Sequence, residues 1–183
     1  LRFANEADAY HDLMQALFEA VPAGQPYEAF MICDHLFQRR YGLGRARPRP
    51  FPLGHWLRNG YLKRGKTIAE LAKACGIDGL ALEQTIALYN HHAAQGLDPQ
   101  FHRGESAYNR IQGEADHKPN PCVAPIVEGP FYAVKIVPGS LGTFSGLRTN
   151  VDAQVLDQSG QAIKGLYAVG NDMASLSLIH ISE

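Results

Sequence analysis

The chain lacks a strong charge of either sign, has few cysteines and has no long hydrophobic run. Its 17 Lys and Arg residues nearly balance 18 Asp and Glu residues, giving a formal net charge of −1. This balance argues against nucleic acid or an anionic membrane surface as the main partner. No apolar run approaches the ~20 residues that cross a bilayer, so no membrane span is expected. Three cysteines without a C-x-x-C pair, Cys33, Cys75 and Cys122, indicate reduced thiols in a cytoplasmic protein.

Several motifs of catalytic and binding sites are also absent. The eight histidines show no H-x-x-x-H or H-E-x-x-H spacing, and the neighbours His91 and His92 diverge by ~100° on a helix, so no metal site is expected. No serine lies in a G-x-S-x-G elbow. The arginines between residues 39 and 49 could meet a phosphate, but a solvated loop is favoured. No G-x-G-x-x-G follows a strand, so the dinucleotide-binding βαβ unit is missing.

Hydrophobic spacing and turn residues predict a helix-rich part followed by a strand-rich part. Asn5 is expected to cap a first helix that carries Tyr10, and Thr67 opens a T-I-A-E capping box. Asp78 is expected to cap the next helix, which stops at Gly96. Strands are predicted at residues 29–33, 131–137, 151–156, 161–163 and 166–169, with a hairpin turn at 157–160.

The stretch at residues 165–175, G-L-Y-A-V-G-N-D-M-A-S, predicts a buried strand over 166–169 that runs into a sharp turn at Gly170 and Asn171. Many α/β folds use such a turn to bring bare backbone up to a cofactor. A preceding loop, with glycines at 139, 142 and 146, can approach a planar ligand closely. From composition alone, a plain β-hairpin with a Gly-rich loop is at least as well supported.

Six motifs in order resemble the FAD-dependent fumarate reductase/3-ketosteroid dehydrogenase superfamily, and within it most resemble 3-oxosteroid 1-dehydrogenases. They are R-F-x-N-E (2–6), G-Y-L-K-R-G (60–65), P-N-P (119–121), G-P-F-Y-A-V-K (129–135), G-T-x-x-G-L-R-T (142–149) and G-L-Y-A-x-G-N-D-M-A-S (165–175). The resemblance implies an α+β cap (substrate) domain portion at 1–127, with a soft boundary near Val127. The C-terminal strands of an incomplete α/β flavin-binding domain would follow at 128–175. Residues 176–183 lose the resemblance abruptly and are expected to be a non-native tail.

The resemblance also implies FAD as cofactor and a steroid-like ketone as substrate. A base would take a proton from C2 of a 3-keto substrate while a hydride leaves C1 for the flavin N5. The family's catalytic tyrosine matches Tyr10, although spacing alone favours a core aromatic there. Asn171 stands where many relatives have Glu, which commonly contacts ribityl or ribose hydroxyls. The flavin-side or active-site loop positions that the resemblance implies are Thr143, Gly146, Leu147, Gly170, Asn171, Asp172, Met173 and Ser175.

Two other interpretations stay open. A fumarate reductase/succinate dehydrogenase-like enzyme resembles the same loop, but the family's substrate-binding His is replaced by Gly142. A non-catalytic folded module is the other. The chain lacks the dinucleotide-binding half and the Y-P-x-x-G motif that follows in the family, so the fragment by itself is expected to be inactive. The electron acceptor and the oligomeric state are not predicted.

Overall fold

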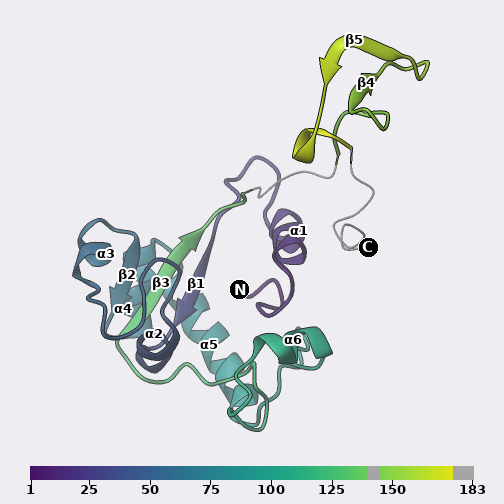
Figure 1. Ribbon diagram of the computed structural model, residues 1–183. Helices are drawn as coiled ribbons and strands as arrows, with labels where there is room; N and C mark the ends of the chain where they lie inside the picture. The colour runs from purple at the N-terminus through teal and green to yellow at the C-terminus, as the bar shows by residue number, and fades with distance from the viewer. Residues whose placement is uncertain (140–144, 175–183) are drawn as a thin grey trace. The chain divides into compact units, whose positions relative to one another are not determined.

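The computed structural model describes residues 1–139 and 145–174, and the chain divides into two compact units, Leu1–Pro138 and Gly139–Glu183. The first unit is built on a three-stranded antiparallel sheet of β1 (Ala29–Cys33), β2 (Leu62–Gly65) and β3 (Phe131–Ile136). Their order is β1-β3-β2, so the last strand in sequence lies between the other two (Figure 1). The register pairs Ala29 with Ile136 and Leu62 with Val134.

The first four residues of the central strand β3 are all buried. Since successive side chains of a strand point to opposite faces, both faces of β3 are covered. Phe131 and Ala133 pack with Leu71 on the face covered by helix α4 (Ile68–Cys75), and helix α5 (Gly79–Ala93) packs against α4 in turn. Tyr132 and Val134 belong to a second cluster with Cys33, Leu43, Ala46 and Leu62, near helices α2 (His35–Tyr41) and α3 (Gly54–Arg58). Burial in this second cluster raises the pKa of the Cys33 thiol to about 12.

The caps of α4 and α5 confirm what the sequence predicts. The Thr67 side chain accepts a hydrogen bond from the Glu70 N–H, and the Glu70 carboxylate accepts one from the Lys66 N–H. Gly76 ends α4 in the left-handed conformation, with φ of 69°. The Asp78 carboxylate caps α5 by accepting from the Ala81 N–H.

The start of helix α1 (Tyr10–Ala20) differs from the prediction. Asn5 does not cap it: the Asn5 side chain accepts from the Ala7 N–H, closing a turn that ends before the helix begins. The N-cap residue is Ala9, which makes no side-chain capping bond. Leu17 alone among the α1 residues is buried, whereas Tyr10 is 54% exposed, so Tyr10 is not a core aromatic within the described residues.

The division between the two compact units falls after Pro138, later in the chain than the domain boundary expected near Val127. The buried Asp34 carboxylate caps α2 and also accepts from the Val127 and Glu128 N–H groups. β3 then pairs with β1 and β2, which keeps residues 128–138 in the first unit. The predicted assignment of 1–127 to a cap domain and 128–175 to a flavin-binding domain concerns the complete enzyme and stays a prediction.

The second unit is a hairpin of β4 (Gln154–Leu156) and β5 (Ala162–Tyr167), followed by a 3-10 turn, η1 (Gly170–Asp172). The turn predicted at 157–160 is present: the Asp157 carboxylate accepts from the N–H groups of Ser159 and Gln161. The segments predicted at 161–163 and 166–169 form one continuous strand as far as Tyr167. The burial predicted for 166–169 is wrong for this unit, because β5 pairs only with β4 and only Ala168 is buried.

Gly65 gives a direct test of packing in the first unit. A Cβ at this position would lie 2.7 Å from Leu71 Cα and 2.8 Å from the Glu70 carbonyl carbon, and both are backbone atoms that cannot move cheaply. Gly65→Ala is therefore expected to lower the free energy of unfolding by about 1–3 kcal/mol, measured by urea unfolding of the chain. The matched control is Gly139→Ala, where a Cβ meets nothing within 4 Å. Equal stabilities of the two variants would contradict the packing described here.

Candidate functional site

Tyr10 is the first residue of α1 and presents its ring to solvent in this unit. The ring meets His11 edge-to-face, with 5.8 Å between the centroids. Within residues 1–139 and 145–174, no side chain hydrogen-bonds to its hydroxyl. The position of the phenol is therefore set mainly by where its helix begins.

The five residues of the R-F-x-N-E motif lie just before α1 and are anchored to a distant part of the chain. The Arg2 guanidinium donates to both oxygens of Asp98, at 2.7 Å each, and to both oxygens of Glu6, at 2.8 and 2.7 Å. It also lies 4.9 Å from the ring centroids of both Tyr89 and Phe101. Bidentate Arg–carboxylate pairs of this kind fix the orientation of the two side chains as well as stabilising their charges.

Burial and hydrogen-bond partners shift the pKa values of Arg2 and Asp98 in opposite directions. Burial alone would lower the pKa of Arg2, but the hydrogen bonds from its guanidinium to Asp98 and Glu6 raise it above its ordinary value. Burial likewise raises the pKa of Asp98, and the hydrogen bonds and charge of Arg2 outweigh this and hold it below the usual range. Both groups therefore stay ionised at neutral pH, and the anchor keeps its full charge.

Asn5 and Asn109 complete the anchor. The Asn5 amide donates to the Phe101 carbonyl at 3.1 Å and to Asn109 Oδ1 at 2.9 Å. Asn109 lies on helix α6 (Ala107–Gln112) and belongs to none of the motifs found in the sequence. It is nevertheless fully buried. Sequence reasoning missed Asp98 and Asn109, because they lie 96 and 104 residues from Arg2 and Asn5 and no local pattern marks them.

The second unit brings together four of the positions expected beside the flavin. Leu147 N–H donates to the Asp172 carbonyl at 2.9 Å, and a short parallel bridge joins Leu147 to Met173. Gly146 lies so close that an added Cβ would meet the Asp172 carbonyl oxygen at 2.6 Å. The segment at Gly146 and Leu147 and the turn after β5 are therefore in direct contact. Thr143 and Ser175 lie outside the described residues.

The remaining two positions lie in the exposed turn η1. Gly170 has a φ of 61° and open space where a Cβ would be, so its backbone is bare. Asn171 and Asp172 follow it and are exposed. Such a turn combines bare backbone with an amide and a carboxylate, groups that can hydrogen-bond to a ligand that carries hydroxyls.

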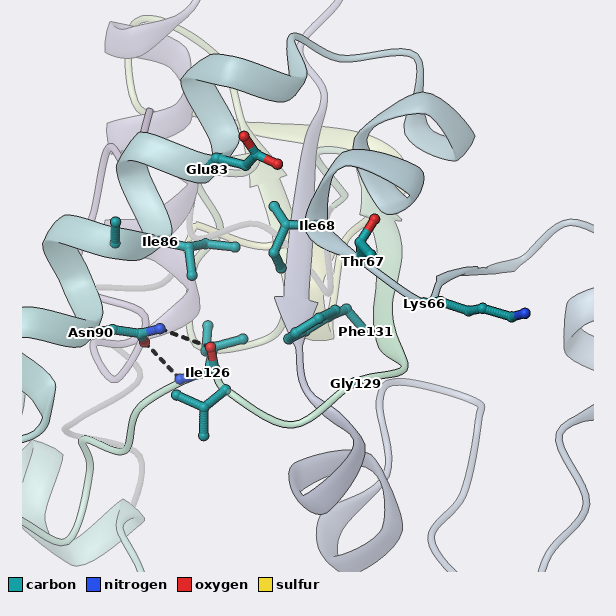
Figure 2. A pocket seen from close by; sticks show the side chains of 11 residues that line it. Lys66, Thr67, Ile68, Glu83, Ile86, Asn90, Ile126, Gly129 and Phe131 are labelled. Carbon is teal, nitrogen blue, oxygen red and sulfur yellow. Dashed lines mark hydrogen bonds between the residues drawn. The ribbon is translucent and has the colours of Figure 1, made fainter.

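A pocket of about 540 Å³ lies elsewhere in the first unit, between α4, α5 and the segment that enters β3 (Figure 2). Asn90 lies at its edge and pairs with the backbone of Ile126, donating at 2.8 Å and accepting at 2.7 Å. None of the described candidate residues lines this pocket. Among the described residues, there is also no group of three His, Cys, Asp or Glu side chains that could hold a metal ion.

A family model described as an FAD binding domain matches residues 1–179, so the chain belongs to this family. The chain is 42% identical over 169 residues to the 4-oxocyclohex-2-ene-1-carboxylate 5-dehydrogenase of Sinomonas cyclohexanicum, covering 92% of this chain and 29% of that protein. It is 38% identical over 175 residues to the 3-oxosteroid 1-dehydrogenase of Mycolicibacterium smegmatis, covering 93% and 31%.

A solved structure extends the likeness to the fold. The 3-ketosteroid delta1-dehydrogenase of Sterolibacterium denitrificans, in complex with 1,4-androstadiene-3,17-dione, superposes with a TM-score of 0.83 at 38% identity, covering 94% of this chain and 31% of that one. The predicted resemblance is thereby confirmed. The chain spans about 30% of the length of these relatives.

FAD is the cofactor that this family binds. The chemistry of the turn η1 is compatible with such a cofactor, because Gly170 exposes bare backbone and the exposed Asp172 carries a carboxylate that can accept hydrogen bonds from hydroxyls. Within the described part of the chain, no long, apolar helix is present that would cross a bilayer.

Proposed function

We propose that this chain is the cap-domain portion and the C-terminal flavin-side strands of an FAD-dependent dehydrogenase. The enzyme desaturates a C–C bond beside a ketone, and a 3-ketosteroid is the first substrate class to test. The observation that carries the proposal is the anchored R-F-x-N-E motif, which sets Tyr10 at the first turn of α1 in a chain 38% identical to a steroid dehydrogenase.

In this proposal Tyr10 acts as the base that removes a proton from the carbon next to the carbonyl. A phenol does this when its own proton is relayed away or its oxygen is held as the anion at the moment of reaction. FAD, when bound, supplies the acceptor for the hydride that leaves the neighbouring carbon. Gly146, Leu147, Gly170, Asn171, Asp172 and Met173 would contact the flavin or shape the loop beside it, with Thr143 and Ser175 assigned to the same loops.

The substrate class rests on what the relatives act on. Both the steroid enzyme and the 42% identical relative are named for ring ketones, one polycyclic and one a cyclohexenone carboxylate. A cyclic ketone is the chemistry they share. A cytoplasmic location is part of the proposal as well, supported by three free cysteines, of which Cys33 is buried.

The test uses the complete enzyme that contains this chain. A flavin absorption spectrum together with dye reduction by 4-androstene-3,17-dione is the expected result. Dye reduction by 4-oxocyclohexanecarboxylate alone would keep the desaturation and replace the substrate class. Turnover of fumarate with reduced dye would favour the fumarate reductase-like alternative, and absence of flavin from the complete protein would favour a non-catalytic module.

A further inference from the structure

We propose that Asn109 is a positioning residue, which holds the turn at residues 5–8 and thereby fixes where Tyr10 stands. The inference rests on the proposed function, in which Tyr10 is the base. Asn109 is fully buried, and all four of its side-chain hydrogen-bonding positions are used. Its Nδ2 donates to the Ala7 carbonyl at 3.0 Å and to Asp8 Oδ1 at 2.8 Å. Its Oδ1 accepts from Asn5 Nδ2 at 2.9 Å and from the Gly104 N–H at 3.0 Å.

The turn that Asn109 holds leads directly into the helix that carries the base. Asp8 N–H donates to the Asn5 carbonyl at 3.2 Å, and the chain then passes through Ala9 to Tyr10. Three of the four contacts of Asn109 are with residues 5, 7 and 8. Only one residue separates the last of these contacts from Tyr10, so a shift of the turn moves the phenol.

Little else in the first unit fixes the start of α1. Its N-cap, Ala9, makes no side-chain capping bond, so the usual local device that sets a helix start is missing. The buried residue of the helix, Leu17, lies two turns further along. Arg2 and Asn5 anchor the motif upstream, and Asn109 is the group that reaches the residues nearest to the base.

A purely structural role for Asn109 is the alternative. Its carbonyl accepts from Cys122 Sγ at 3.0 Å, and its side chain also closes the loop at Gly104. Loss of these contacts would lower stability and enzyme concentration whatever residue stands at position 10. A positioning role, in contrast, exists only while position 10 carries the phenol.

A double-mutant cycle in the complete, flavin-loaded enzyme separates the two roles. Asn109→Ala is expected to lower the single-turnover rate of flavin reduction by androstenedione by about 100-fold, the cost of misplacing a reacting group by about 1 Å. The rate constant at saturating substrate should fall while the half-saturating concentration changes little. In a Tyr10→Phe background, the same substitution is expected to change the rate by less than about twofold. Equal losses in both backgrounds would overturn the proposal.

A gentler pair keeps the test informative if Asn109→Ala does not fold. Asp8 is exposed, so its substitution removes one contact without emptying the core. Asp8→Ala is expected to slow flavin reduction, whereas Asp8→Asn keeps an oxygen acceptor for Asn109 Nδ2 and should restore most of the rate. Equal rates for these two variants would overturn the proposal.

The matched control is Asn90→Ala. Asn90 also fastens a helix to a distant backbone segment through two hydrogen bonds, but those bonds reach Ile126 and not the turn before α1 (Figure 2). It is expected to lower the melting temperature without the rate loss. The proposed function fails separately: a Tyr10→Phe enzyme with full activity would dismiss Tyr10 as the base, whatever Asn109 does.

Discussion

Tyr10→Phe in the complete enzyme is expected to lower the rate of substrate desaturation by about 10²- to 10⁴-fold, the usual contribution of a positioned general base. The substitution removes one oxygen from an exposed ring and leaves the edge-to-face contact with His11 possible. Flavin content and melting temperature should therefore stay unchanged. The measurement is steady-state dye reduction by androstenedione, together with the absorption spectrum of the bound flavin.

The control for this prediction is Tyr27→Phe. Tyr27 is also exposed, and its ring meets Phe18 edge-to-face at 4.9 Å, a contact that Phe can keep. Turnover should be unaffected by this change. If the Tyr10 variant also keeps wild-type turnover, another group removes the proton and Tyr10 is an ordinary helix residue.

Arg2→Ala is expected to lower the free energy of unfolding by about 3–5 kcal/mol, because it leaves the buried carboxylate of Asp98 without its ion-pair partner. The Asp98 side chain is only 3% exposed and receives two hydrogen bonds from Arg2. The two rings that face the guanidinium, Tyr89 and Phe101, lose a contact as well. Urea unfolding of the chain measures the loss.

Two comparisons sharpen the test of Arg2. Arg58→Ala removes an exposed arginine of α3 and should change stability by less than about 0.5 kcal/mol. Arg2→Met combined with Asp98→Leu removes both charges and should recover much of the loss, since no charge is then left unpaired. A single Arg2→Ala variant as stable as the Arg58 control would refute the anchoring role of the pair.

The same pair predicts a pH dependence. The pKa of Asp98 is lower in the folded chain than its usual value, so the stabilisation is present above the unfolded-state pKa of about 3.9 and is lost as pH falls through the lower, folded value. The Asp98→Asn variant should lose less stability than the wild type between about pH 4 and pH 2.

Local signals in the sequence account for much of the fold. The ends of α4 and the start of α5 are set by capping residues that lie at the helix ends themselves: Thr67, Gly76 and Asp78. The sequence therefore predicts them correctly. The hairpin turn at Asp157 is local in the same sense. Each of these features depends on hydrogen bonds that span four residues or fewer.

The anchor of the candidate site could not be predicted in this way. Asn5 looks like a cap from its neighbours, yet its amide is committed to Phe101 and Asn109, which only the folded chain brings close. The apolar residues of β5 predict burial without saying which element would provide it, and Leu166 and Tyr167 are exposed in this unit. The six motifs identify the family, but they do not reveal that the distant side chains of Asp98 and Asn109 hydrogen-bond to the R-F-x-N-E motif.

The order of the three-stranded sheet has a consequence for synthesis of the chain. β1 and β2 are translated before β3, and neither pairs with the other. Their common partner β3 begins at Phe131, 98 residues after β1 ends at Cys33 and 66 residues after β2 ends at Gly65. Pairings between strands so far apart in sequence form slowly, and unpaired strand edges favour aggregation meanwhile. A nascent chain that stalls before Phe131 therefore leaves β1 and β2 without the strand that pairs with both of them in this sheet.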